Sequence, residues 1–464
     1  MDGLECSEIL FSQIDLGDRF DSDYYTKNYL HISDQLSKVS TEKLGKLATP
    51  VASAFYPAAT QLYSEGDTAF ARCVDCVSYP VITKDQDSKF EKIPYTFGKE
   101  NKGISFIKAE DIIITKVGTP CYASILTDYD EIALSRTVMG LTGIHGIDPY
   151  YLMVFLRCKY GFEQLFRQRE LTIQYQLTLP RVKAVDVFLA DDKLQKTVKK
   201  LCEKSREHQK ESNEAYQLAE QTLAEIVKCP DFSTLSAYSI KSLNSSFTLS
   251  GRLDAEYYQP KYEAIAQKLN TSETVFSLCK LYDKNFAPQD KEAYQYIELA
   301  DVGQSGDISD ADIQYGSDLP TRARRIVKTG QIIVSSVEGS LQSCALISDE
   351  FDGALCSTGF YVLDSDCINS ETLLVLFKSE PIQALMKQRC SGTILTAISK
   401  DELLSMPLPM IDEEVQKVIA AKVQESFALR KQSKQLLEYA KRAVEMAIEQ
   451  GEDTALEWLK DKVD

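Results

Sequence analysis

The sequence of 464 residues lacks any run of roughly 20 apolar residues, the length that a helix needs to cross a bilayer. Its first residues show no basic segment followed by an apolar run, so we expect no signal peptide and no membrane partner. The 12 cysteines form no tight framework, and such scatter is typical of free thiols in a reducing compartment. These absences predict a cytoplasmic globular protein.

Motifs of common metal and nucleotide chemistry are also missing. The chain has 3 histidines, and its C-x-x-C pair, Cys73 and Cys76, lacks the second pair that a structural zinc site needs. Gly98 and Gly103 have the spacing of a G-x-x-x-x-G-K-[ST] phosphate-binding loop, but Ile104 stands where the lysine is required. Asp148–Tyr151 lacks the second proline of a methyltransferase strand end and is typical of a turn that opens a helix. The sequence therefore predicts no catalytic residue, no metal and no cofactor bound by this chain.

A basic surplus is absent as well. Lysine and arginine total 52 and aspartate and glutamate 69, which gives a formal net charge of −17. This charge weighs against a simple nucleic-acid binder, which usually carries a basic excess. It does not exclude one, because phosphate contacts are local and a basic groove can lie in an acidic protein. An acidic surface also fits protein partners or solubility.

What the sequence does contain is an internal repeat. Six pairs of segments match in the same order in the two halves. They are Arg19–Tyr25 with Arg252–Tyr258, Phe70–Val77 with Tyr296–Gly303, Ile107–Gly118 with Val327–Gly339, Ala133–Thr137 with Ala354–Thr358, Gln168–Arg169 with Gln388–Arg389, and Leu194–Val198 with Val415–Ile419. This order predicts two copies of a unit of roughly 200 residues. The repeat alone fits a duplicated enzyme or scaffold equally well.

Each copy ends in a long segment without glycine or proline, at residues 193–228 and 413–450. Both are rich in strong helix formers, and apolar residues recur at spacings of three and four. Asp412 is the expected N-cap of the second helix, and Pro230 and Gly451 are the expected terminators. We expect the two helices to pack against each other, antiparallel, with one globular copy at each end. In the alternative, each helix covers only its own domain.

These patterns predict an α+β fold, with two pseudo-symmetric α/β domains separated by a pair of long antiparallel, coiled-coil-like helices. Expected boundaries are 1–190 for the first globular domain, 191–229 for the first helix, 230–410 for the second globular domain, 411–450 for the second helix and 451–464 for a short C-terminal helix. Trp458, the only tryptophan, lies in this last segment, which is expected to pack on the helical pair or to contact a partner.

Basic side chains recur at matched places in the two copies. They are Lys102 with Arg322, Lys108 with Lys328, and Arg169 with Arg389. The first two pairs lie in basic segments that are expected to be loops, where matched charge suits phosphate contact, although a solvated loop is an equal alternative. Arg169 and Arg389 follow predicted helices, so each can contact a base or a phosphate or cap the preceding helix.

The order of the segments resembles the specificity subunit of type I restriction–modification systems. The resemblance is carried by Arg252–Tyr262, Tyr294–Ile308, Ala354–Leu363 and Gln388–Ile419. Within the last of these, LPMIDEEVQK is the most telling passage. The resemblance spans almost the whole chain, and the first copy repeats it more loosely. The first copy departs from it at Phe188–Asp191, which contains no proline.

The resemblance implies that each globular copy is a target recognition domain that reads one half of a bipartite, asymmetric sequence in double-stranded DNA. The helices would set the length of the unread gap and dock two methyltransferase subunits, and restriction subunits would complete the complex. These partners would use S-adenosylmethionine, ATP and Mg, and they would flip the target base out of the duplex. This chain would be a non-catalytic DNA-recognition subunit.

On this interpretation the candidate DNA-contacting residues are Lys99, Lys102, Lys108, Lys116, Arg169, Arg322, Arg324, Arg325, Lys328 and Arg389. Replacing Arg322 and Arg325 by alanine is expected to weaken binding to all sequences and to lower its salt dependence. Three alternatives stay open: an enzyme with a cryptic active site, a helical scaffold that binds no DNA, and the specificity subunit of a related defence complex.

Overall fold

The computed structural model describes residues 6–11, 14, 19, 21–54, 62, 66–170, 176–231, 235–236, 238–308, 311–392 and 396–463. The chain divides into two compact units, Met1–Lys210 with Arg430–Asp464 (unit 1) and Glu211–Leu429 (unit 2). Each long helix therefore contributes one part to each unit, whereas the sequence patterns predict the helices as segments separate from the globular domains. Within the described ranges, no helix is both long enough and apolar enough to span a bilayer.

The described residues of unit 1 form two main β-sheets, with strand orders β2–β10–β7–β8–β4 and β5–β3–β9–β6. Their strands are β2 (Thr49–Ala52), β3 (Thr68–Ala71), β4 (Val81–Ile82), β5 (Glu91–Ile93), β6 (Phe106–Ile107), β7 (Ile112–Thr115), β8 (Ala123–Leu126), β9 (Ile132–Leu134) and β10 (Val138–Thr142). A small antiparallel pair joins β1 (Thr41–Lys43) to β11 (Asp186–Phe188).

Unit 2 forms the corresponding sheets, with strand orders β12–β19–β16–β17 and β14–β13–β18–β15. Their strands are β12 (Lys280–Tyr282), β13 (Ala293–Ile297), β14 (Asp312–Tyr315), β15 (Ala323–Ile326), β16 (Ile332–Ser335), β17 (Cys344–Leu346), β18 (Leu355–Ser357) and β19 (Phe360–Asp364). A short pair joins β20 (Cys390–Ser391) to β21 (Ala397–Ile398).

The two units share one topology. In unit 1, β3 runs parallel to β9, and β7 runs antiparallel to β10. In unit 2, β13 runs parallel to β18, and β16 runs antiparallel to β19 in the same way. The apolar, β-branched runs within the third matched pair of segments form β7 and β16, and all four residues of each strand are buried. The predicted duplication and the α+β fold class are therefore confirmed.

Short helices complete each unit. Unit 1 contains α1 (Lys27–Leu36), α2 (Leu44–Leu47), α3 (Cys73–Ser78), α4 (Tyr95–Glu100), α5 (Pro149–Arg157), α6 (Lys159–Arg167), α7 (Leu179–Lys183) and α16 (Glu452–Val463). Unit 2 contains α9 (Phe247–Ser250), α10 (Pro260–Leu269), α11 (Val275–Leu278), α12 (Ser370–Lys378), α13 (Glu380–Arg389) and α14 (Lys400–Leu404). The α5–α6 and α12–α13 pairs occupy equivalent places in the chain order.

Asp148 opens a helix, as its sequence context predicts. Its carboxylate accepts a hydrogen bond from the backbone N–H of Tyr150 at 2.9 Å, and Pro149 occupies the first turn of α5. The helix that Asp148 opens ends at Arg157, because Cys158 adopts an extended conformation (φ −71°, ψ 166°) before α6 begins.

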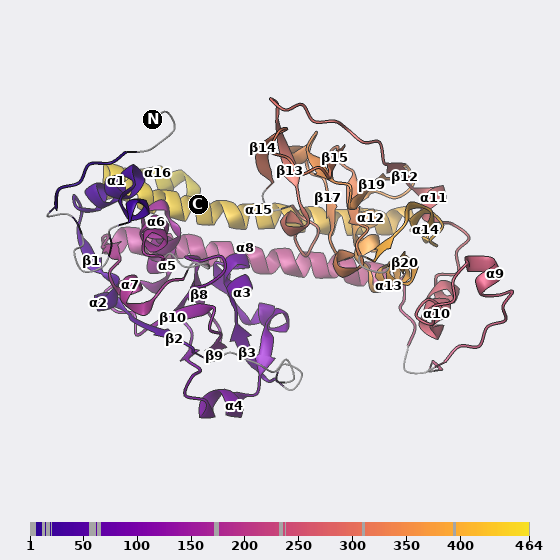
Figure 1. Cartoon of the computed structure of the whole chain (residues 1–464), viewed down its shortest axis with the longest axis horizontal. Coiled ribbons are helices and arrows are strands. Elements are labelled where there is room, and N and C mark those ends of the chain that lie inside the picture. The colour runs from indigo at the N-terminus through magenta and orange to yellow at the C-terminus, as the bar shows by residue number, and fades with distance from the viewer. Residues whose placement is uncertain are drawn as a thin grey trace. The chain divides into compact units, whose positions relative to one another are not determined.

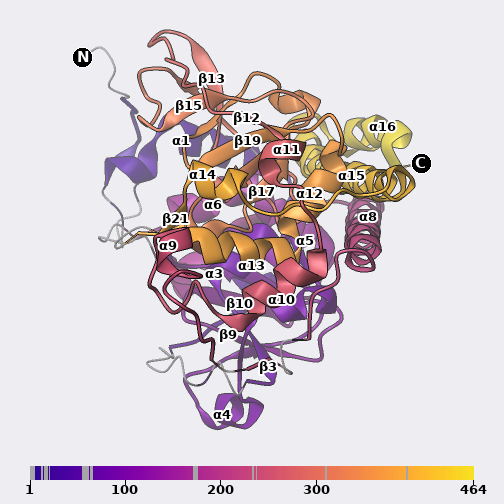
Figure 2. The same cartoon turned by 90° about the vertical axis from the view of Figure 1, so that its right-hand side faces the viewer.

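The long helices are α8 (Asp192–Ala224) and α15 (Glu413–Gln450), of 33 and 38 residues. At 1.5 Å per residue they measure about 50 and 57 Å. They lie side by side, and Figure 2 shows them almost end-on (Figures 1 and 2). As predicted, α15 begins directly after Asp412, whose carboxylate accepts from the N–H of Glu414 at 2.9 Å, and ends before Gly451, whose φ is +96°.

Hydrogen bonds fix the direction of the helix pair within each unit. In unit 1, Ser205 of α8 lies against Ser433 of α15. In unit 2, Ser212 lies against Ser426, so residue numbers rise along one helix as they fall along the other. The predicted antiparallel pair is confirmed, and the alternative in which each helix covers only its own domain is not what the structure shows.

One glutamine near the start of each long helix anchors it to the globular part of its unit. The side-chain oxygen of Gln195 accepts from the backbone N–H of Asp148, the N-cap of α5, at 2.8 Å. In unit 2 the side-chain oxygen of Gln416 accepts from the N–H of Asn369, the N-cap of α12, at 2.7 Å. The sixth matched pair of segments is thus a repeated joint between a long helix and its domain.

Candidate nucleic-acid interface

The first matched segment builds the same small structure in both units. In unit 1 the Arg19 guanidinium donates to both carboxylate oxygens of Asp21, at 2.6 and 2.9 Å, and to the backbone carbonyl of Arg169 at 3.0 Å. The Tyr25 hydroxyl donates to the carbonyl of Arg19 at 3.1 Å. The hydrogen bonds from the guanidinium lower the pKa of the Asp21 carboxyl. Phe20 lies outside the described residues.

In unit 2 the Arg252 guanidinium donates to Asp254 at 2.8 and 2.7 Å and to the carbonyls of Gln388 and Cys390 at 3.4 and 3.1 Å. The Tyr258 hydroxyl donates to the carbonyl of Arg252 at 3.0 Å. This repeated motif therefore ties the start of each copy to the residues at the end of α6 or α13. The sequence showed the motif and the matched Gln-Arg pair separately, but not that they contact each other.

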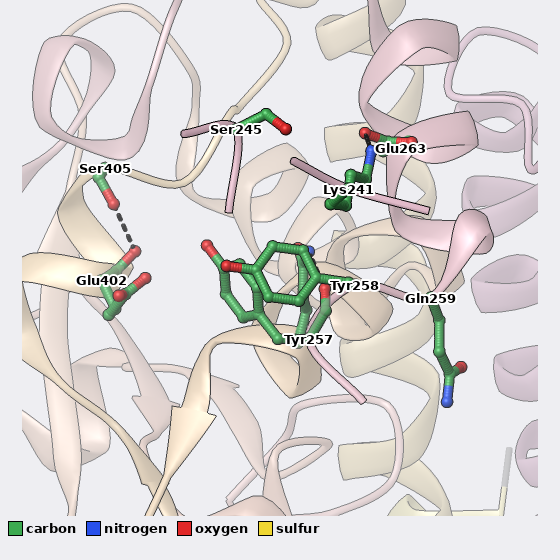
Figure 3. A pocket seen from close by; sticks show the side chains of 9 residues that line it. Lys241, Ser245, Tyr257, Tyr258, Gln259, Glu263, Glu402 and Ser405 are labelled. Carbon is green, nitrogen blue, oxygen red and sulfur yellow. Dashed lines mark hydrogen bonds and ion pairs between the residues drawn. The ribbon is translucent and has the colours of Figure 1, made fainter. Parts of the chain in front are cut away.

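In unit 2 the motif lines a cavity of about 350 Å³ (Figure 3). The Tyr257 and Tyr258 side chains lie between Glu402 and Ser405 on one side and the Lys241–Glu263 ion pair on the other. The Ser405 hydroxyl donates to the backbone carbonyl of Glu402 at 3.1 Å. The polar groups that line the cavity thus include pairs that already bind each other.

Loops gather where β3, β7 and β9 end. We call residues 116–122 and 135–137 the loop edge of unit 1, and residues 336–343 and 357–359 the loop edge of unit 2. The two loops of each edge are joined by hydrogen bonds: the N–H of Lys116 donates to the carbonyl of Thr137 at 2.8 Å, and the N–H of Ser336 donates to the carbonyl of Gly359 at 2.9 Å. Loops at the end of a rigid sheet are common places for binding residues.

The loop edges correct the register of the fourth matched pair by one residue. Ala133 pairs with Phe70 in unit 1, and the residue that pairs with the matched Tyr296 in unit 2 is Leu355. The structure therefore matches residues 133–137 with 355–359, and not with 354–358 as the sequence suggested. The Ser135 hydroxyl accepts a hydrogen bond from the backbone N–H of Thr137 in unit 1. The Ser357 hydroxyl accepts one from the N–H of Gly359 at the same place in unit 2.

In each unit the two basic residues of the predicted basic loop lie at opposite ends of a strand, so they do not form a single patch. Lys102 precedes β6 and Lys108 follows it, and both side chains are exposed. Arg322 precedes β15 and Lys328 follows it, also exposed. The four residues of β15 span about 13 Å. The segment expected to be a basic loop is therefore divided by a strand, because β15 pairs with β18.

The ends of these strands place the residues at different edges of the sheet. The carbonyl of Arg322 accepts from the N–H of Thr358 at 2.8 Å, so Arg322 lies at the loop edge of unit 2. The backbone N–H groups of Lys108 and Lys328 both donate to the side chain three residues later, Asp111 or Gln331, at 2.9 Å. Lys108 and Lys328 are thus structurally equivalent in the two units.

Three further candidates have partners within the protein. The Lys99 ammonium forms an ion pair with Glu131 and lies 4.0 Å from the centre of the Phe106 ring. Arg324 donates to the carbonyl of Thr321 at 2.9 Å. Arg325 is partly buried and donates to the carbonyl of Tyr282 at 3.4 Å, so it packs toward β12.

Arg169 and Arg389 occupy the positions that the helix-capping alternative requires. Arg169 Nε donates to the carbonyl of Phe166 in α6 at 2.8 Å. An Arg389 guanidinium nitrogen donates to the carbonyl of Leu385 in α13 at 3.2 Å, and this side chain is only 13% exposed. Burial lowers the pKa of Arg389. Arg169 thus binds a carbonyl of the last turn of the preceding helix, and Arg389, the last residue of α13, binds a carbonyl of its own last turn.

The remaining candidate, Lys116, follows β7 on the loop edge of unit 1 and is partly buried. Burial of its ammonium group and the neighbouring Arg136 guanidinium lower the pKa of Lys116. Sequence reasoning did not single out Arg136. Arg136 lies in the fourth matched pair of segments, where it is a charged residue in the first copy only. The structurally equivalent residue in unit 2 is the uncharged Thr358.

Solved structures similar to this chain include the S subunit of a type I restriction–modification system from M. genitalium, with 12% identity and a TM-score of 0.37 over 90% of this chain and 94% of that chain. The HsdS subunit from Thermoanaerobacter tengcongensis has 14% identity and a TM-score of 0.28 over 90% of this chain and 96% of that chain. The type IIG restriction endonuclease BpuSI has 10% identity and a TM-score of 0.29 over 38% of this chain and 28% of that chain. No protein-family model and no curated protein matches the chain.

Proposed function

We propose that this chain is the DNA-specificity subunit of a type I restriction–modification complex. The observation that carries the proposal is the presence of two units with one topology. Each unit has an exposed basic residue before the strand that runs beside its loop edge. This residue is Lys102 in unit 1 and Arg322 in unit 2. Two such units in one chain suit a DNA target that is read in two parts. The order of matched segments described above supports the same proposal.

In this proposal the chain recognises DNA and its partners carry out the chemistry. Two methyltransferase subunits would dock on the chain and use S-adenosylmethionine, and restriction subunits would use ATP and Mg. The continuous helices α8 and α15 would set the number of unread base pairs between the two halves of the target. This chain would contribute no catalytic group.

A salt-titrated binding assay tests the proposal directly. The chain, purified with its methyltransferase partner, is mixed with labelled duplex DNA fragments from a host that carries the system. We expect tight binding to a subset of fragments and a steep fall in affinity as salt rises, because phosphate contacts release counterions. Equal, weak binding to every fragment would contradict the proposal.

The second candidate is a helical scaffold that binds no DNA, which the net charge of −17 favours. On that hypothesis the chain would assemble with its protein partner, but the complex would bind duplex DNA no better than the partner alone. The same titration therefore distinguishes the two functions.

A further inference from the structure

Two basic side chains meet at the loop edge of unit 1, each supplied by a different sheet. Lys116 directly follows β7 of the five-stranded sheet, and Arg136 follows β9 of the four-stranded sheet. The backbone N–H groups of Lys116 and Val117 both donate to the carbonyl of Thr137, at 2.8 and 3.1 Å. These bonds hold the two loops side by side, and the Arg136 guanidinium is close enough to help lower the pKa of Lys116.

The surroundings of Lys116 do not balance its charge. In the part of the chain that the structure describes, no carboxylate lies within ion-pair distance of its ammonium group. Glu170, an acidic residue of the adjoining segment, is 3.9 Å from Arg181 and accepts from the Thr178 hydroxyl at 3.3 Å. Lys116 is partly buried, whereas Arg136 is exposed. An ammonium that is partly withdrawn from water beside a second cation is stabilised by an anion.

We infer that Lys116 and Arg136 together bind one backbone phosphate of DNA at the loop edge of unit 1, an inference that rests on the proposed function. A phosphodiester presents charged oxygens that accept charge-assisted hydrogen bonds from both ammonium and guanidinium groups. Lys116 supplies a point charge, and the exposed Arg136 supplies a planar fork. The pair positions unit 1 on the duplex and reads no base.

Unit 2 uses the equivalent residues differently. Ser336 and Thr358 stand where unit 1 has Lys116 and Arg136. The Ser336 hydroxyl donates to the carbonyl of Gly359 at 2.8 Å, so it closes its own loop edge. The phosphate site therefore belongs to unit 1, and the two units hold DNA by different contacts.

The test compares variants of the full chain in complex with its methyltransferase partner, using duplex DNA that contains the methylated target. Lys116→Gln with Arg136→Gln is expected to weaken binding about tenfold at low salt and to reduce the slope of log affinity against log salt by about 0.9, the value for one phosphate. The exchanged pair, Lys116→Arg with Arg136→Lys, keeps both charges and is expected to bind nearly as the wild type.

Lys38→Gln with Lys46→Gln is the matched control. It removes the same charge from unit 1 at two exposed, ion-paired lysines, and it is expected to leave the slope unchanged. Thermal unfolding of each variant shows whether the fold is retained. Wild-type slope and affinity in the Lys116→Gln, Arg136→Gln variant would overturn this site while leaving the proposed function in place. Weaker binding with an unchanged slope would overturn it too. A wild-type complex that does not bind DNA would overturn the proposed function, and this inference with it.

Discussion

Ser205 and Ser433 exchange hydrogen bonds across the helix pair of unit 1. The Ser205 hydroxyl donates to the backbone carbonyl of Ser433 at 2.9 Å, and the Ser433 hydroxyl donates to the carbonyl of Ser205 at 2.8 Å. In unit 2 the Ser212 hydroxyl donates to the carbonyl of Ser426 at 2.8 Å. All four serines are buried. The contact in one unit is the repeat-related image of the contact in the other.

Substitution of Ser205 tests whether this contact needs a small polar side chain. Ser205→Ala removes one buried hydrogen bond and is expected to lower the free energy of unfolding by about 1 kcal/mol. Ser205→Leu adds volume where the helices approach closely and is expected to cost more, about 1–3 kcal/mol. Thermal or urea unfolding of the full chain measures both. Ser37→Ala, at an exposed hydroxyl that donates to the carbonyl of Asp34, is the control; a Ser205→Leu protein as stable as this control would contradict the close packing.

The Arg252–Asp254 pair predicts a pH dependence of stability. Hydrogen bonds from the Arg252 guanidinium lower the pKa of the Asp254 carboxyl below its ordinary value of 3.8. The pair therefore stabilises the fold fully above about pH 3.8, and this contribution is lost as the pH falls through the lowered pKa. Asp254→Asn is expected to reduce the melting temperature at pH 7, and the difference from the wild type should narrow at lower pH. A constant difference between pH 7 and pH 3 would contradict the linkage.

The sequence predicted the repeated elements because their causes are local. The run of β-branched residues at Ile112–Thr115 predicts a buried strand, and an uninterrupted segment of strong helix formers after Asp412 predicts α15. Those signals depend on neighbours in the chain, so they can be read without knowing the tertiary structure. Even the repeated joint that Gln195 and Gln416 form was visible as a matched pair, although its partner was not.

The candidate site was less predictable, because it depends on which strand ends meet. Lys102 and Lys108 are close in sequence, but β6 runs between them and separates them. Lys116 and Arg136 are 20 positions apart and yet meet, because their strands end at the same edge. The one-residue shift at 355–359 likewise depends on strand register, and spacing in the sequence does not fix register.

The exposed residue Arg322 is expected to contribute to DNA binding without selecting a sequence. Arg322→Ala should weaken binding of the complex uniformly, by up to about tenfold, and reduce the salt slope by about 1. The double substitution of Arg322 and Arg325 tests the whole segment, but Arg325 packs against Tyr282. Arg325→Ala alone is therefore the informative comparison, and it is expected to lower the melting temperature more than the salt slope. If Arg322→Ala changes neither affinity nor slope, the start of β15 does not contact DNA.

Structural differences between the two units predict an asymmetric target. A chain whose units presented the same side chains would read the same bases in both halves, and its target would be palindromic. Here α4 lies between β5 and β6 of unit 1, whereas the described residues between β14 and β15 of unit 2 form no helix. Methylation sequencing of a host that carries the system is therefore expected to show two different short motifs separated by a gap of fixed length. Deleting seven residues from each of α8 and α15 removes one heptad from each helix and alters neither loop edge. The gap should therefore become shorter while both half-motifs stay the same. A continuous or palindromic methylated motif would contradict the assignment of one half-target to each unit.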